Sequence, residues 1–248
     1  MDANHKKELL QKIASDYESE INKASLVVAK NIKEDVFKYL SNDIKAADTP
    51  SIIFTAGAPA CGKSETVKYI LQKYPSIVHI DPDEFRGLFP YYLGTNAENY
   101  QKSCTHIMSY CFNKAVRGNF DIIHDTNFAH VDTAIANVRE ALKRKYLVQI
   151  YYVYMDPRLA WKHAMQRDRK ILPDVFCRNF GLVRDTIKAV LSHPEIKGKQ
   201  IRCRAFVYEQ KSGQPGFTTT IHENITAESL DTMVPFGYST TDLAKIAV

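Results

Sequence analysis

One glycine-rich segment limits what this chain can fold into. Residues 57–64 read Gly-Ala-Pro-Ala-Cys-Gly-Lys-Ser, a full match to the pattern GxxxxGK[ST]. The glycines let the backbone form a nest of N–H groups that point at phosphate oxygens, and a helix N-terminus adds positive potential. The apolar run 51–55 precedes the match, and residues 63–73 have the pattern of a helix. The sequence therefore predicts a strand, a phosphate-binding loop and a helix in succession.

The residue types of this loop indicate a nucleoside triphosphate as its ligand. Lys63 is predicted to reach the β- and γ-phosphates, and the Ser64 hydroxyl to hold Mg²⁺. Cys61 is interpreted as a small side chain that points away from the phosphates, in preference to a redox switch. The residues predicted to bind ATP are Gly57, Ala58, Pro59, Ala60, Cys61, Gly62, Lys63, Ser64 and Glu65, and the predicted metal ligand is Ser64.

Beyond the loop, short apolar runs alternate with helical stretches, which is typical of an α/β protein. Strands separated by helices of this length pair in parallel, with right-handed crossovers. We therefore expect a doubly wound, mainly parallel sheet with helices on both faces. The predicted strands of this part are 51–55, 77–80, 120–124 and 147–155, and the predicted helices are about 63–73, 99–117, a stretch from about 131 to 142, one after Pro157, and 175–191.

The two ends of the chain have different patterns. Residues 1–48 predict an N-terminal helical extension, because apolar side chains recur at every fourth position before the break at residues 48–50. Residues 201–209 and 217–222 predict a C-terminal β-hairpin around a turn-rich segment. We expect one domain over 49–248, and the last 25 or so residues have too weak a pattern for an assignment.

Composition excludes several classes of protein. Apolar residues make up 45% of the chain and the net charge is +5, so a packed core is expected and wholesale disorder is not. No apolar run approaches the roughly 18 residues of a membrane span, and the first residues lack the apolar stretch of a secretory signal. The five cysteines form no CxxC pair, which argues against a disulfide framework and a structural zinc site. We expect a reducing, cytoplasmic compartment and no membrane partner.

Acidic residues follow the second and third predicted strands, at the sheet edge where the phosphate loop also lies. Transfer of a phosphoryl group to a hydroxyl requires a carboxylate that orients the acceptor and takes its proton. Asp83 is our choice for this base, and Asp125 is predicted to position the acceptor. Asp81 is interpreted as a turn residue or as a residue that contacts a ligand of the metal. Arg86 and Asn127 are predicted to contact the acceptor as well.

Arginines and histidines near these motifs have less specific roles. Arg167 is predicted to stabilise the transferring phosphoryl group from a short lid, with Arg169 and Arg178 as further lid residues. His79 and His124 lie in predicted strands and are interpreted as hydrogen-bonded core residues, not metal ligands.

The sequence resembles the zeta-toxin family of P-loop kinases from about residue 51 to 208. The resemblance is carried by the loop ending in Lys63-Ser64, the segment 80–86 (Ile-Asp-Pro-Asp-Glu-Phe-Arg), the acid after the third strand, and an arginine-rich segment that leads into a helix. It implies that Asp83 is the base, that Asp125 contacts a sugar hydroxyl, and that the lid arginines fall near Arg167 and Arg178. It also implies ATP-dependent phosphorylation of UDP-N-acetylglucosamine and pairing with an antitoxin that blocks the nucleotide site.

One motif departs from that family and leaves the acceptor open. Residues 125–127 read Asp-Thr-Asn, where zeta toxins have Glu/Asp-Gly-Thr, and Asp-Thr-Asn is similar to polynucleotide 5′-hydroxyl kinases. We expect an ATP/Mg²⁺-dependent kinase acting on a hydroxyl of a nucleotide-linked small metabolite. The alternatives are a kinase for 5′-hydroxyl ends of nucleic acids and a nucleotide-gated effector module, without turnover, whose N-terminal helices grip a protein partner.

Overall fold

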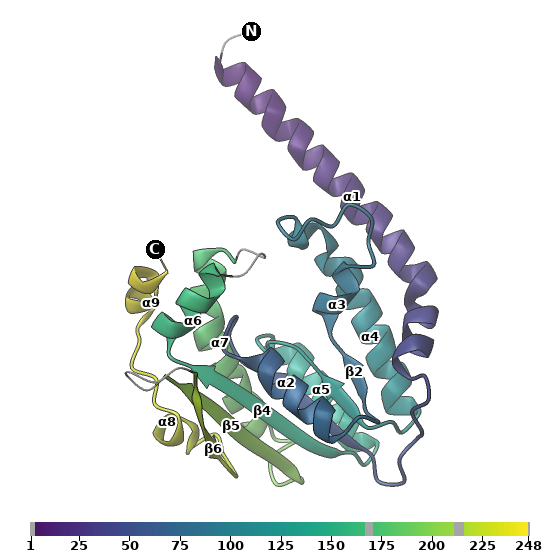
Figure 1. The fold of residues 1–248 in the computed structure, drawn as a ribbon, viewed down its shortest axis with the longest axis vertical. Helices are drawn as coiled ribbons and strands as arrows, with labels where there is room; N and C mark the ends of the chain where they lie inside the picture. Colours follow the sequence, from purple (N-terminus) through teal and green to yellow (C-terminus); the bar gives the residue numbers. More distant parts are fainter. Residues whose placement is uncertain (1–2, 167–170, 211–215, 248) are drawn as a thin grey trace.

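The computed structural model describes residues 3–166, 171–210 and 216–247 of the chain. In these residues six strands form one sheet in the order β2-β3-β1-β4-β5-β6 (Figure 1). Neighbouring strands are parallel from β2 through β5, and β6 pairs antiparallel with β5. The strands are β1 (Ser51–Ala56), β2 (Val78–Ile80), β3 (Ile122–His124), β4 (Leu147–Met155), β5 (Ile201–Glu209) and β6 (Thr218–His222).

Helices cover both faces of the sheet, as the alternating pattern predicted. On one face, Val67 and Ile70 of α2 pack against Ile53 and Ile123. The other face carries the larger core, to which α4, α5 and α7 contribute. The helices are α1 (Ala3–Leu40), α2 (Lys63–Lys73), α3 (Pro82–Arg86), the 3-10 helix η1 (Ala97–Tyr100), α4 (Gln101–Arg117), α5 (Val131–Lys143), α6 (Pro157–Met165), α7 (Pro173–Ser192), α8 (Leu230–Met233) and α9 (Thr240–Ile246).

Local chemistry accounts for where several helices begin. Asp156 caps α6 by accepting a hydrogen bond from the Arg158 N–H, and Pro157 occupies the first turn, where its missing N–H costs nothing. In the C-terminal tail, Ser239 and Asp242 form a reciprocal capping box at the start of α9. The predicted hairpin is present as β5 and β6, and β5 also joins the parallel sheet through β4. The pattern did not predict α3, α8 or α9, because short helices contain too few turns for a periodic signal.

The N-terminal extension is one long helix, α1, which projects away from the body of the molecule (Figure 1). Its C-terminal half packs on α4 and reaches the main core, where Ala29 is fully buried. The Ser103 hydroxyl of α4 donates to the Ser25 hydroxyl of α1 at 2.9 Å. Residues 6–20 are exposed throughout, including Leu9 and Tyr17. None of the described helices, α1 included, combines the length and apolar character needed to cross a bilayer.

Two truncations of α1 are expected to have very different effects on stability. Residues 6–20 are exposed, so we expect deletion of residues 1–20 to change the melting temperature by less than about 3 °C. Deleting residues 1–40 uncovers the apolar face of α4. We expect this deletion to lower the melting temperature by about 10 °C or more, or to cause aggregation. Differential scanning calorimetry of the full chain and the two truncated chains measures their melting temperatures. Equal melting temperatures for the two truncations would contradict the prediction.

Candidate active site

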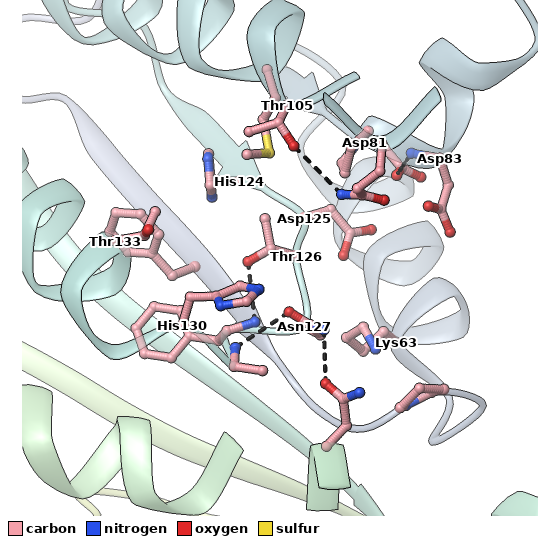
Figure 2. A pocket seen from close by; sticks show the side chains of 18 of the residues that line it. Lys63, Asp81, Asp83, Thr105, His124, Asp125, Thr126, Asn127, His130 and Thr133 are labelled. Carbon is pink, nitrogen blue, oxygen red and sulfur yellow. Dashed lines mark hydrogen bonds between the residues drawn. The ribbon is translucent and has the colours of Figure 1, made fainter. Parts of the chain in front are cut away.

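The carboxyl ends of β1, β2 and β3 lie side by side because the three strands are parallel neighbours. The phosphate loop follows β1, Asp81 follows β2 and Asp125 follows β3. These segments surround a cavity of about 810 Å³ (Figure 2). Of the residues singled out from the sequence, the cavity is lined by Pro59, Ala60, Lys63, Ser64, Asp81, Asp83, Arg86, His124, Asp125 and Asn127.

The backbone of the phosphate loop has a shape that requires its two glycines. A Cβ on Gly57 would come within 2.5 Å of the Val153 carbonyl oxygen of β4, so no larger residue fits there. Gly62 has a φ of 94°, in the left-handed region, and a Cβ there would lie 3.2 Å from the Tyr208 ring. Cys61 is buried and points away from solvent. Glu65 is exposed on the first turn of α2.

Lys63 lies across the mouth of this loop. Its ammonium group donates to the carbonyl oxygens of Gly57, at 2.8 Å, and Ala58, at 3.1 Å. The side chain therefore lies against the backbone of the phosphate loop, next to the first turn of α2. Ser64 is exposed to the same cavity. Cation, hydroxyl and helix N-terminus thus face the same space, which is the arrangement that favours an anionic ligand.

Asp125 is a buried carboxylate held by two partners. One oxygen accepts a hydrogen bond from the Thr55 hydroxyl of β1 at 2.7 Å, and the other lies 3.5 Å from Nε2 of His79. Burial raises the pKa of Asp125, but His79 and Thr55 outweigh it and hold the pKa below its ordinary value. Burial likewise lowers the pKa of His79, and the nearby carboxylate outweighs it and raises the pKa. Each of the two groups thus favours the charged form of the other, and Asp125 is the one of the pair that lines the cavity.

Asp81 adds a second carboxylate beside this pair. It caps α3 by accepting a hydrogen bond from the backbone N–H of Asp83 at 2.7 Å. Burial and the charge of Asp125 together raise the pKa of Asp81 to about 6. Ligand atoms of His79, Asp81 and Asp125 all lie within 4.8 Å of one another. The oxygen donors here and on Ser64 fit Mg²⁺, which prefers carboxylate, hydroxyl and water oxygens.

The raised pKa of Asp81 predicts a pH-dependent stability that the variant Asp81→Asn lacks. The pKa is higher in the folded chain than the ordinary 3.8, so the folded state holds more protons between about pH 4 and 6. Stability therefore falls as the pH rises through this window. Asparagine keeps the capping oxygen without the charge. We expect Asp81→Asn to be more stable than the wild type by about 1–3 kcal/mol at pH 8, with the difference vanishing near pH 4.

Urea denaturation in the presence of EDTA, at pH 4, 6 and 8, tests this, since a bound divalent cation would itself neutralise the carboxylates. A difference that does not change with pH would contradict the expectation.

Asp83 lies on the first turn of α3 with its side chain 58% exposed to the cavity. Its carboxylate forms an ion pair with the guanidinium of Arg86, one turn later, whose side chain is only 3% exposed. Arg86 also donates to Oε1 of Gln101 at 2.7 Å, at the start of α4. Arg86 therefore lines the cavity and at the same time holds the Asp83 side chain in place.

The segment after β3 links the phosphate loop to α7. The backbone N–H of Gly57 donates to the carbonyl oxygen of Asn127 at 3.2 Å, and the Asn127 side chain donates to Asn179 of α7 at 2.9 Å. Of the predicted lid arginines, Arg167 and Arg169 lie outside the described residues. Arg178 is on an exposed face of α7 and does not line the cavity.

Three residues that position the site were missed by sequence reasoning: Thr55, Gln101 and Asn179. Thr55 donates to the acid Asp125, and Gln101 accepts from Arg86. Asn179 accepts from the amide of Asn127. Thr55 had a usable signal, because it is a polar residue in an otherwise apolar strand. His124 is buried, as expected, but the expected hydrogen bond is absent. Neither ring nitrogen has a partner among the described residues.

Residues 36–196 match the model of the family described as zeta toxin. The chain belongs to the zeta-toxin family. The fold of the chain is that of the family's P-loop kinases, and family and fold together support a kinase-type phosphotransferase. No curated protein sequence shows significant similarity to the chain.

Solved structures share the fold of this zeta toxin at low sequence identity. A chain of the PezAT chromosomal toxin–antitoxin system of Streptococcus pneumoniae is 14% identical, with a TM-score of 0.64 over 88% of this chain and 92% of that one. A chain of the AvrRxo1-ORF1:AvrRxo1-ORF2 complex with sulphate ions is 13% identical, with a TM-score of 0.53 over 87% and 71%. The same complex with ATP gives 12% identity and a TM-score of 0.52 over 90% and 71%.

Proposed function

We propose that this zeta toxin is an ATP- and Mg²⁺-dependent kinase that phosphorylates a hydroxyl of a nucleotide-linked small metabolite of the UDP-N-acetylglucosamine type. The observation that carries the proposal is the shared cavity. Lys63 and Ser64 of the phosphate loop line it together with Asp83 and Asp125. A triphosphate on the loop would thus face two carboxylates from the segments after β2 and β3, which is the arrangement that phosphoryl transfer to an alcohol requires.

The roles of these residues follow from their chemistry. Asp83 is the most exposed acid in the cavity and takes the proton of the acceptor hydroxyl as its oxygen forms a bond to the γ-phosphorus. The bond between that phosphorus and the β–γ bridging oxygen breaks, and ADP leaves. Lys63 stabilises the charge that develops on the phosphate oxygens. Asp125, charged and held by Thr55, accepts a hydrogen bond from the acceptor and orients it.

Magnesium and ATP fit the residues present. The Ser64 hydroxyl would hold Mg²⁺, with Asp81 accepting hydrogen bonds from the ion's water shell, and the bound ion would neutralise the β- and γ-phosphates. A solved structure of the AvrRxo1-ORF1:-ORF2 complex contains ATP, which supports ATP as the donor for this fold. Lys63 now donates to two loop carbonyls and would exchange these bonds for phosphate oxygens.

A panel of acceptors tests the reaction. Labelled ATP and Mg²⁺ are offered together with UDP-sugars, nucleosides, dinucleotide cofactors and 5′-hydroxyl oligonucleotides. We expect label to enter the UDP-sugar. Incorporation into the oligonucleotides alone, with binding that weakens steeply as salt rises, would favour a nucleic-acid kinase. ATP binding without transfer to any acceptor would favour the effector module.

We also propose a protein partner of the antitoxin type. Among the solved structures that share this fold are a chain of the PezAT toxin–antitoxin system and a chain of the complex of AvrRxo1-ORF1 with AvrRxo1-ORF2. If the chain is toxic to bacteria, its expression without a partner protein should slow the growth of a bacterial host. The catalytic variant Asp83→Asn should not. Equal growth inhibition by both chains would mean that any toxicity does not depend on phosphoryl transfer.

A further inference from the structure

The N-terminal half of α1 carries a row of apolar side chains that the described chain leaves uncovered. Leu10, Ile13 and Tyr17 recur at intervals of three and four residues, so they lie on one face of the helix. These residues are 58%, 56% and 66% exposed. Leu9 lies one turn before Ile13, at the edge of the same face, and is 43% exposed. We call these four residues the α1 stripe.

The stripe continues the face by which α1 packs on the body of the molecule. Ile21 follows Tyr17 at the same spacing and packs against the main core, and Val28 and Ile32 extend the face toward the C-terminal end of α1. The body covers this second half of the helix through α4 and η1, whereas the first half projects beyond it (Figure 1). α1 therefore presents one continuous apolar face, of which the N-terminal part faces water.

The projecting segment, residues 6–20, forms about four turns of helix. A helix in a folded protein gains most of its stability from the packing of its apolar face, and one of this length that stands alone in water is marginal. Every residue of the segment is exposed, so it gains no such packing from the rest of the described chain. A second apolar surface is needed to complete it.

The charges of the segment show what kind of surface fits the stripe. Residues 6–12 contain three lysines and one glutamate, a net charge of +2, whereas residues 13–20 contain three acids and no base, a net charge of −3. Two copies of the helix placed antiparallel would bring the positive segment of each beside the negative segment of the other, with Ile13 near the middle. A parallel pair would place like charges side by side. The segment is therefore complementary to itself in one orientation only, about a twofold axis.

We propose that the N-terminal half of α1 is a self-association surface, on which the same helix of a second copy of this chain lies antiparallel. The two α1 stripes pack together, and the lysines of each helix lie beside the acids of the other. The apolar face and both charges belong to one helix, so no other protein is required, and the projection of α1 leaves a second copy room to approach (Figure 1). Two helices of about four turns bury less than the roughly 1,200 Å² of a standard interface, so we expect a weak dimer with a Kd of about 10–100 µM.

Sedimentation equilibrium of the full chain, at concentrations from about tenfold below to about tenfold above this Kd, measures the association. The first variant is Ile13→Glu, which places a charge in the middle of the stripe. Its matched control is Ser15→Glu, which adds the same charge on the opposite face of the helix, where Ser15 is exposed. Melting temperatures show whether each chain is folded.

An exchange of charges tests the orientation. Lys6→Glu together with Lys7→Glu makes the first segment negative. Adding Asp16→Lys and Glu18→Lys makes the second segment positive. These two acids form no ion pair within the described residues, whereas the third acid of the segment pairs with Lys23 at 2.8 Å and is left unchanged.

We expect the wild type and Ser15→Glu to dimerise with Kd values within about twofold of each other, because surface substitutions away from a contact have small effects. Ile13→Glu should raise Kd by at least about tenfold, because the dimer would bury a charge against apolar side chains. The lysine double variant should raise Kd by about three- to tenfold, and the fourfold variant should return it to within about threefold of the wild type. None of the substituted residues lines the active-site cavity, so the result does not depend on the proposed function.

A wild-type chain that stays monomeric over the whole concentration range would overturn the inference and would leave the stripe to a different protein. A dimer that Ile13→Glu leaves intact would overturn it as well, because the contact would then lie elsewhere. If the fourfold variant dimerises no better than the lysine double variant, the antiparallel arrangement is wrong.

Discussion

Asp83→Asn is expected to lower kcat by about 10²–10⁴-fold, the range associated with loss of a positioned general base. Asparagine has nearly the same shape and still offers an oxygen to Arg86, so the start of α3 should keep its structure. It cannot take the proton of the acceptor hydroxyl. The affinity for ATP should stay within about twofold, because the side chain belongs to α3 and not to the phosphate loop, as the separate positions of Asp83 and Lys63 in Figure 2 show. Single-turnover kinetics and calorimetry with an ATP analogue measure the two quantities.

The neighbouring acid provides the control for this variant. Glu84 is exposed on the same short helix and does not line the cavity, so Glu84→Gln should retain wild-type turnover. Full turnover in Asp83→Asn would show that the base has been assigned to the wrong residue, and Asp125 would then be the next acid to test.

Lys63→Ala is expected to remove both nucleotide affinity and turnover, with kcat/KM lower by about 10²–10³-fold. Loss of one charged donor that points at the transferring group costs about 3–4 kcal/mol of transition-state stabilisation in a site with little water. This energy corresponds to the expected fall in kcat/KM. Unlike Asp83→Asn, this variant should bind the ATP analogue more weakly, because the ammonium group contacts the phosphates before the reaction as well as during it.

The lysine also donates to two carbonyls of its own loop, so the structural effect of Lys63→Ala must be measured separately. Melting temperature and circular dichroism show whether the loop variant is folded. Lys68→Ala is the matched control, since Lys68 is exposed on α2 and does not line the cavity. Wild-type ATP affinity in a folded Lys63→Ala would contradict the idea that this loop grips the triphosphate.

Much of the architecture could be predicted because its signals are local. The strand–loop–helix unit around residues 57–64 follows from the glycine pattern, and α2 has the predicted bounds, Lys63–Lys73. The long apolar run at Leu147–Met155 is β4, because a strand buried on both faces shows as continuous apolar sequence. The other predicted strands and helices after residue 50 begin and end within two residues of their predicted positions, whereas the helical extension predicted over 1–48 ends at Leu40. The predicted helix at 99–117 is divided into η1 and α4.

The partners of each side chain could not be predicted in this way. Thr55 and Asp125 are 70 residues apart, yet they share a hydrogen bond because β1 and β3 are adjacent strands. Asn127 meets Asn179 from a helix 52 residues later. Local patterns contain no information on such distances, because contacts of this kind depend on strand order and on how helices cross the sheet.

The amino-acid sequence alone determined the phosphate loop, the alternation of strands and helices, and the two acids at the strand ends, because glycine geometry and hydrophobic periodicity act over a few neighbouring residues. Only the tertiary structure decided what surrounds these groups. It placed His79 3.5 Å from Asp125, so that each favours the charged form of the other, and left Asp81 beside them with a raised pKa. It also placed His124 in the cavity wall, where neither ring nitrogen has a hydrogen-bond partner among the residues that the structure describes. Burial and long-range neighbours set these properties, and both arise only once the chain has packed.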